Sequence, residues 1–215
     1  MLVRTLRFVL DLVVGGAAWV FVVPWCWLLL VHTCRGVTGA PPEEPALFAG
    51  LVLGLLLACW RRPNLLVHTW LHESAHALMC VLLLVRVGAI RATAGQGGEV
   101  RHEAVGPLRL VPILIAPYVL PLVLGPLLFA RWLSPDGLLR TLLTFGCGLA
   151  IFMHLHGLAL NLRLNTFGPT ADLARVGHLL AFALIATSLL LLAAAAVLVL
   201  WSTQPPAWWT GLFAA

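Results

Sequence analysis

The chain has 215 residues, of which 61% are hydrophobic and 10% are charged, whereas about a quarter of the residues of a soluble domain are charged. A water-soluble fold could not bury so much apolar surface, so this composition excludes a soluble globular domain. The net charge of +5 comes from 13 arginines and no lysine. These arginines are spread singly or in pairs over the predicted loops, which argues against a nucleic-acid partner and favours anchoring at lipid headgroups.

Apolar runs recur along the whole chain and predict an all-α polytopic membrane protein of about six transmembrane helices, since about 20 helical residues cross the hydrocarbon core. We expect these helices at residues 8–31, 46–60, 64–87, 107–130, 138–163 and 174–201. The first run is longer than the apolar part of a secretory signal, so we expect it to be retained as a span. The run 46–60 is short, so it either begins earlier, near Pro41-Pro42-Glu43-Glu44-Pro45, or does not cross fully.

Residues 88–105 are the one internal stretch that is neither an apolar run nor a short turn. Two segments of this stretch flank Gly95-Gln96-Gly97-Gly98, which predicts a small Gly-rich β-hairpin, with a flexible loop as the alternative. The next run, 107–130, contains several prolines, and each interior proline removes a backbone hydrogen bond and bends the helix. This helix is therefore either a gate or a kinked packing element.

The third run contains the motif His72-Glu73-Ser74-Ala75-His76, an HExxH sequence. Residues four apart lie on the same face of a helix, so both imidazoles can bind one zinc ion while Glu73 lies beside that face. Zinc lowers the pKa of a bound water from about 16 to about 7, and a neighbouring carboxylate can take up the proton as the water attacks a carbonyl. A hydrogen-bonded polar cluster without metal is the alternative. It is less favoured because a charged side chain at the bilayer centre costs about 2.5 to 3.5 kcal/mol.

A catalytic zinc site usually has three protein ligands, so a third ligand has to come from another part of the chain. The best candidate is Asp172, which follows the helix-breaking pair Gly168-Pro169. Irregular backbone at membrane depth is tolerated where it lines a cavity, which favours an inward-facing Asp172. The alternative is that Asp172 caps the last helix. His154 and His156 face nearly opposite sides of their helix, so at most one of them could replace or assist Asp172. A hydrogen-bonded histidine in the protein core is the favoured interpretation of both.

Other polar residues have weaker assignments. His68 lies two helical turns, about 12 Å, from His76, which is too far to bind the same ion. We expect His68 to support the site or to lie at the interface. Asp11, in the first run, has no role in this scheme. The tail from Ser202, with Trp208-Trp209, is expected to lie among lipid headgroups.

Three features together resemble the site-2 protease (M50) family of intramembrane zinc metalloproteases, in its M50B-like form. They are the HExxH motif within a span, the Gly-rich hairpin after it, and the element Asn165-x-x-x-Pro169-x-x-Asp172. The resemblance covers about residues 64–185 and is most specific at HExxH, whereas Leu173 stands where the family usually has Gly. It implies a metalloprotease core at 64–201, preceded by two transmembrane segments at 1–63 and followed by an interfacial tail at 202–215.

This resemblance implies a zinc endopeptidase that hydrolyses a peptide bond in a transmembrane or membrane-proximal segment of a protein substrate. His72, His76 and Asp172 would bind Zn2+, and Glu73 would be the general base. The partners would be the lipid bilayer and a membrane protein substrate. The protein would be a multi-pass protein of the cell (inner) membrane with its site toward the cytosolic face.

The resemblance also implies how the substrate is held. Asn165 would bind the substrate or the oxyanion, and the hairpin, with Gly97 and Gly98, would hold the substrate as an added strand. Two other functions stay open. One is a non-proteolytic scaffold or pseudoprotease that keeps the metal site, and the other is a membrane metalloenzyme of different chemistry that uses His154, His156 and His178. The sequence indicates no oligomeric state.

Overall fold

The computed structural model describes residues 8–60, 64–93, 97–168 and 171–202. Gly95, Gln96 and Pro169, and the tail with Trp208-Trp209, lie outside the described residues, so the expectations for them stay predictions. The described chain forms two compact units, each built from three separate stretches. The first unit contains the described residues of 1–25, 63–120 and 157–189, and the second contains those of 26–62, 121–156 and 190–215.

Three helices in the described part of the chain are long and apolar enough to cross a membrane, and they coincide with three of the expected runs. The first is Leu10–Gly36, in which the π-helical segments η1 (Leu10–Gly15) and η2 (Ala18–Val22) are followed by α2 (Val23–Gly36). The others are α7 (Leu138–Asn165) and α9 (His178–Trp201). The fold is therefore mostly helical, with three candidate membrane spans.

The other expected runs form shorter elements. α3 (Glu44–Trp60) has 17 residues and begins inside the Pro-rich turn, which is one of the two alternatives expected for it. α4 (Leu65–Leu82) has 18 residues, and the polar residues of its HExxH motif lower its hydropathy.

The run 107–130 is not one kinked helix, as expected, but two helices, α5 (Pro107–Val119) and α6 (Leu124–Leu133). These two helices reach the length and hydropathy of a span only when taken together. The break begins at Leu120, which has extended backbone. Pro121 follows it, and a proline disfavours helical backbone in the residue before it.

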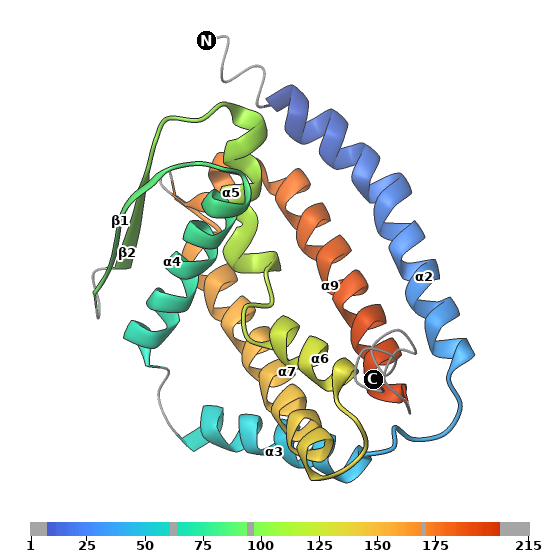
Figure 1. Cartoon of the computed structure of the whole chain (residues 1–215). Coiled ribbons are helices and arrows are strands. Elements are labelled where there is room, and N and C mark those ends of the chain that lie inside the picture. The colour runs from blue at the N-terminus through green and yellow to red at the C-terminus, as the bar shows by residue number, and fades with distance from the viewer. Residues whose placement is uncertain (1–7, 61–63, 94–96, 169–170, 203–215) are drawn as a thin grey trace, which may run out of the picture. The chain divides into compact units, whose positions relative to one another are not determined.

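In the first unit, α4 lies between the hairpin and α5 and packs against both (Figure 1). Asn64 begins α4, because its side-chain oxygen accepts hydrogen bonds from the N–H groups of Leu66 and Val67 at 3.1 and 3.3 Å. β1 (Val87–Thr93) and β2 (Gly97–His102) pair in antiparallel fashion, which confirms the predicted hairpin.

The short helix α8 (Asp172–Val176) lies between α7 and α9 in the chain and packs against α5. Its residues Leu173 and Val176 are buried in an apolar cluster with Leu114, Ile115 and Tyr118 of α5. This burial fixes α8 with its first residue, Asp172, at a defined place beside α5.

The N-terminal helix contacts the start of α9 through Asp11, Gly15 and Trp19, which are spaced four residues apart. Asp11 Oδ1 accepts a hydrogen bond from the N–H of Leu180 at 2.8 Å, and Trp19 Nε1 donates one to the carbonyl of Leu179 at 3.1 Å. Gly15 allows the close approach, since a β-carbon there would lie 2.6 Å from the nitrogen of Leu180. Asp11, for which the sequence indicated no role, therefore caps α9 and puts its charge at the positive end of the helix dipole.

In the second unit, two arginines that were expected at lipid headgroups are buried instead. Arg131 and Arg140 are 0% exposed, and both form ion pairs with Glu43, at 2.6 and 3.3 Å. Their guanidinium groups also donate to the carbonyls of Leu200 and Ser202 at the end of α9. An unpaired charge is costly to bury, and these ion pairs and hydrogen bonds offset the cost of placing two arginines in an apolar interior.

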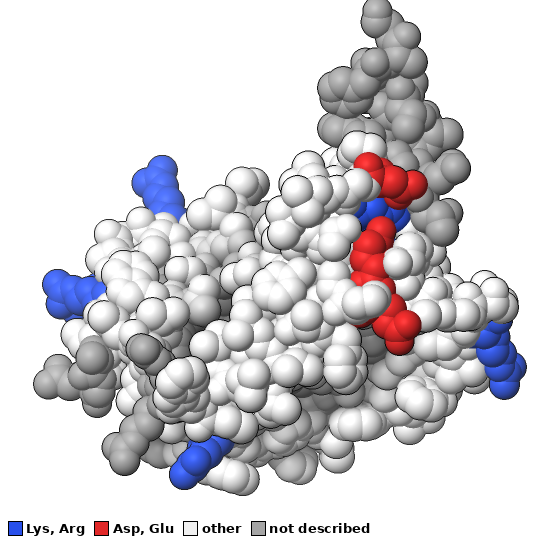
Figure 2. All heavy atoms as spheres, turned by 90° about the horizontal axis from the view of Figure 1, so that it is seen from below, with Lys and Arg blue, Asp and Glu red and all other residues white. Residues whose placement is uncertain are grey.

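Figure 2 shows one face of the molecule, on which charged side chains are few and the acidic ones gather in one place.

Candidate metal centre

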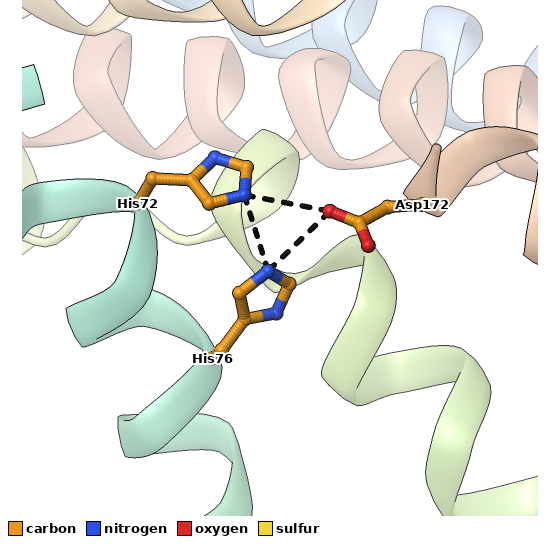
Figure 3. Close-up of side chains that lie close together, drawn as sticks. All are labelled: His72, His76 and Asp172. Atoms are coloured by element: carbon orange, nitrogen blue, oxygen red, sulfur yellow. Dashed lines mark hydrogen bonds and ion pairs between the residues drawn. The ribbon is translucent and has the colours of Figure 1, made fainter. Parts of the chain in front are cut away.

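The three expected metal ligands come together in the first unit. His72 and His76 lie one turn apart on α4, and Asp172 is the first residue of α8. The two Nε2 atoms are 3.2 Å apart, and each lies 3.4 Å from Oδ2 of Asp172 (Figure 3). The side chains thus point one donor atom each toward a common centre.

This triangle has the size of one face of a tetrahedral metal site. Bonds of about 2.0 to 2.1 Å at tetrahedral angles place ligand atoms about 3.3 to 3.4 Å apart, and the observed separations are 3.2 to 3.4 Å. The three donor atoms would occupy three of four positions and leave the fourth for water or for a substrate atom. The residues present therefore fit a tetrahedral metal ion.

The other ring nitrogen of His76 determines which nitrogen carries the proton. His76 Nδ1 lies 2.6 Å from the backbone carbonyl of Ile113 on α5. A carbonyl can only accept, so Nδ1 is the donor, and in the neutral ring Nε2 keeps its lone pair. The lone pair of Nε2 faces Asp172 and His72, as a metal ligand requires.

His72 is oriented in the same way by a longer chain of hydrogen bonds. Its Nδ1 lies 2.9 Å from Oδ1 of Asn161, whose Nδ2 donates to the carbonyl of Pro117 at 3.1 Å. Because the amide nitrogen is committed to Pro117, the Asn161 oxygen faces His72 and accepts from its Nδ1. Two neutral imidazoles and one carboxylate then point three electron pairs at one centre, an arrangement that a cation stabilises.

Asp172 lies where its charge is supported on two sides. Burial disfavours the charged form, but when His72 and His76 also carry protons on Nε2, their contacts with Asp172 outweigh this effect and hold the pKa of the Asp172 carboxyl below its usual range. A cation bound between the three groups would support the same negative charge in place of those protons. The alternative role as a helix cap is not seen, because no side chain makes a capping hydrogen bond at the start of α8. At the start of α9, the capping carboxylate is that of Asp11.

Glu73 of α4 is buried, and its side chain faces the hairpin. Its side chain is in contact with Gly98 of β2, and a β-carbon on Gly98 would lie only 2.5 Å from Glu73 Oε1. Only glycine allows the strand to approach this closely. The absence of a side chain at Gly98 therefore leaves the space that the Glu73 carboxylate occupies.

These residues line a cavity of about 640 Å³, a size typical of ligand sites. The predicted substrate residues Asn165, Gly97 and Gly98 all line it, as does His68, expected to support the site or to lie at the interface. The remaining walls come mainly from the hairpin, α5 and the end of α7, among them Glu99, Val100, Ile113 and Asn161.

Among the described residues, His72, His76 and Asp172 form the one group of three His, Cys, Asp or Glu side chains close enough to share a metal ion. His154 and His156 belong to the second unit, and Nε2 of His178 lies 2.9 Å from the carbonyl of Thr166. These three histidines therefore supply no second group of ligands in the described part of the chain.

Two partners of the site were missed at the level of sequence. Asn161 lies one turn before Asn165 on α7, and this spacing alone could have suggested that both face the cavity. The carbonyl of Ile113 carries no side-chain signal and could not have been found.

Comparisons of this chain with protein-family models, with curated proteins and with solved structures found no match.

Proposed function

We propose that this protein is an intramembrane zinc metalloendopeptidase of the site-2 protease type, which hydrolyses a peptide bond in a transmembrane or membrane-proximal segment of another protein. One observation carries the proposal. On an HExxH helix, the Nε2 atoms of His72 and His76 form a triangle with Oδ2 of Asp172, 3.2 to 3.4 Å on a side. This is the spacing of three ligands in a tetrahedral site with one open position.

Zinc is the metal that this set of ligands favours. Two imidazoles and one carboxylate are a ligand set of catalytic zinc sites, whereas Mg2+ and Ca2+ prefer oxygen ligands, of which this triangle offers one. Zinc held by these three residues would supply a Lewis acid for the scissile carbonyl and would lower the pKa of a water molecule to about 7.

Glu73 is the proposed general base. It neighbours the ligand His72 in the chain, lines the same cavity and packs closely against Gly98. As the water oxygen attacks the carbonyl carbon, Glu73 takes up the water proton, and it then gives a proton to the leaving nitrogen as the C–N bond breaks. Asn165, which lines the same cavity, has an amide N–H that can bind the carbonyl oxygen as negative charge develops on it.

β2 is the proposed binding edge for the substrate. It lines the cavity with Gly97, Gly98, Glu99 and Val100, and the glycines let another backbone come close. An extended substrate segment can pair with such a strand through main-chain hydrogen bonds, which bind many different sequences. A transmembrane substrate helix would have to unwind locally to reach this strand.

The proposed location is the cell membrane, with α3, α4 and the α5–α6 pair added to the three candidate spans. The composition supports it, and so does the N-terminal helix, of which only 11% is buried in its most apolar window. An apolar helix that packs so little against its own chain needs lipid or another apolar partner.

The direct test of the chemistry is Glu73→Gln, with Glu103→Gln, at an exposed carboxylate, as the matched control. The full chain is reconstituted in vesicles with a quenched-fluorescent transmembrane peptide that contains helix-breaking residues near its end. We expect Glu73→Gln to abolish cleavage, because no base is left to take up the proton, while zinc content stays that of the wild type. Glu103→Gln should cleave at the wild-type rate.

Unchanged cleavage in Glu73→Gln would remove Glu73 as the base. Zinc-loaded wild type that cleaves no more of the peptide than Glu73→Gln would count against the protease and in favour of a membrane scaffold.

A further inference from the structure

α5 contains two interior prolines, Pro112 and Pro117. In an α-helix each N–H donates to the carbonyl four residues earlier, and proline has no N–H. Pro117 therefore leaves the carbonyl of Ile113 without its helical donor, and Pro112 does the same for Leu108. In apolar surroundings, a carbonyl without a donor costs free energy unless another group binds it.

The carbonyl of Ile113 receives its hydrogen bond from the metal centre. His76 Nδ1 donates to it at 2.6 Å, and both residues are buried, at 8% and 1% exposure. The side chain of Leu108, by contrast, is 89% exposed in the first turn of α5. Of the two carbonyls that the interior prolines leave free, that of Ile113 is therefore the one that contacts a metal ligand.

The second imidazole depends on a similar acceptor. Asn161, which binds His72, donates to the carbonyl of Pro117 itself. The residue four positions further along the chain is Pro121, which again has no N–H to offer. Both hydrogen-bond chains that orient the imidazoles thus end on carbonyls for which the residue four positions later is a proline.

We propose that Pro117 is a positioning residue for the metal centre, which reserves the Ile113 carbonyl for Nδ1 of His76. This inference rests on the metal site of the proposed function. With an ordinary residue at position 117, its N–H would compete for the same carbonyl. The His76 ring would then lose the bond that fixes both its orientation and the nitrogen that carries its proton. The run of prolines in this region thus has a role in the site that is distinct from bending the helix.

The test compares Pro117→Ala with Pro112→Ala in the full chain, purified in detergent. Both variants restore one N–H in the same helix, so they are matched in chemistry and differ in the carbonyl they affect. Zn2+ affinity is measured by competition with a chelator. We expect Pro117→Ala to bind Zn2+ about 10- to 100-fold more weakly than the wild type, the loss typical of removing a hydrogen-bond partner from a metal ligand. Pro112→Ala should stay within about 2-fold.

A third variant distinguishes the effect of a backbone N–H at position 117 from the effect of losing the proline ring. Lactic acid at position 117, introduced by nonsense suppression, lacks both the N–H and the proline ring. We expect it to keep nearly wild-type affinity for Zn2+. Equal losses in Pro117→Ala and Pro112→Ala, or a loss with lactic acid as large as with alanine, would assign the effect to the bend of the helix and overturn the proposal.

A second measurement needs no metal and keeps the two proposals apart. The 15N shifts of His76 in metal-free protein report which ring nitrogen carries the proton. We expect Nδ1–H in the wild type and in Pro112→Ala, and a mixture of the two forms in Pro117→Ala. The same form in all three proteins would overturn the role of Pro117. Wild type that binds no Zn2+ but shows the expected shifts would instead count against the proposed function.

Discussion

Gly98 and Glu73 illustrate how the candidate site depends on single residues. The HExxH spacing was sufficient to predict that His72 and His76 share a helix face, because i and i+4 positions always do in an α-helix. The contact between Glu73 and Gly98 could not be predicted in the same way, because it depends on how the strand packs on α4. The hydrogen bond of His76 to the Ile113 carbonyl could not be predicted either. Every residue carries a backbone carbonyl, and only the fold determines which one lies next to His76.

We predict that Gly98→Ala removes activity without removing the metal. The new methyl group would overlap the Glu73 side chain, so the carboxylate must turn away from the attacking water, and cleavage should fall at least about 10-fold. Zinc content should be unchanged, because the three atoms nearest to the new methyl group all belong to Glu73, which is not a ligand. The measurement is peptide cleavage in vesicles together with metal analysis. The control is Gly88→Ala in the same hairpin, where the nearest atom, the Arg101 carbonyl oxygen, would be 3.6 Å away. Equal activity in the two variants would contradict the role given to Gly98.

At the scale of elements, the hairpin and the long apolar helices were predictable, and the course of the Pro-rich run was not. Gly-rich sequence between two short segments indicated a turn, and β1 and β2 bear this out. The run 107–130 gave no sign of where it would break, because each of its prolines can bend or end a helix. The start of α9 could not be predicted from the local sequence, because the residue that caps it, Asp11, lies in a helix far away in the sequence.

We predict that Asp11→Ala loosens the first turn of α9. Loss of a capping carboxylate typically costs about 0.5 to 2 kcal/mol, so exchange of the Leu180 amide hydrogen should speed up about 2- to 30-fold. Hydrogen exchange followed by mass spectrometry of the detergent-purified chain measures this directly. Val13→Ala, in the same helix at a side chain that is 61% exposed, is the control. Unchanged exchange around Leu180 in Asp11→Ala would contradict the capping role.

At the scale of the whole molecule, the composition predicted a chain surrounded by lipid and some of its membrane spans, but not how the helices pack. High hydrophobicity and scarce charge predicted membrane helices, and three helices have the required length and hydropathy. Arg131 and Arg140 show why the rest could not be predicted. An arginine near an apolar run is expected at lipid headgroups, whereas these two are buried with Glu43. Each compact unit also combines three stretches distant in sequence, which no local pattern indicates.

The proposed function depends on a zinc site made by two histidines of α4 and the aspartate of α8. Its most direct test is the zinc stoichiometry of the detergent-purified chain, in the wild type, His72→Ala and Asp172→Ala, with His156→Ala in the second unit as the control. We expect about one zinc ion per chain in the wild type and the control, and strongly reduced binding in the other two variants. Well-folded wild type that binds no zinc would contradict it, and the triangle of His72, His76 and Asp172 would then be a hydrogen-bonded polar cluster.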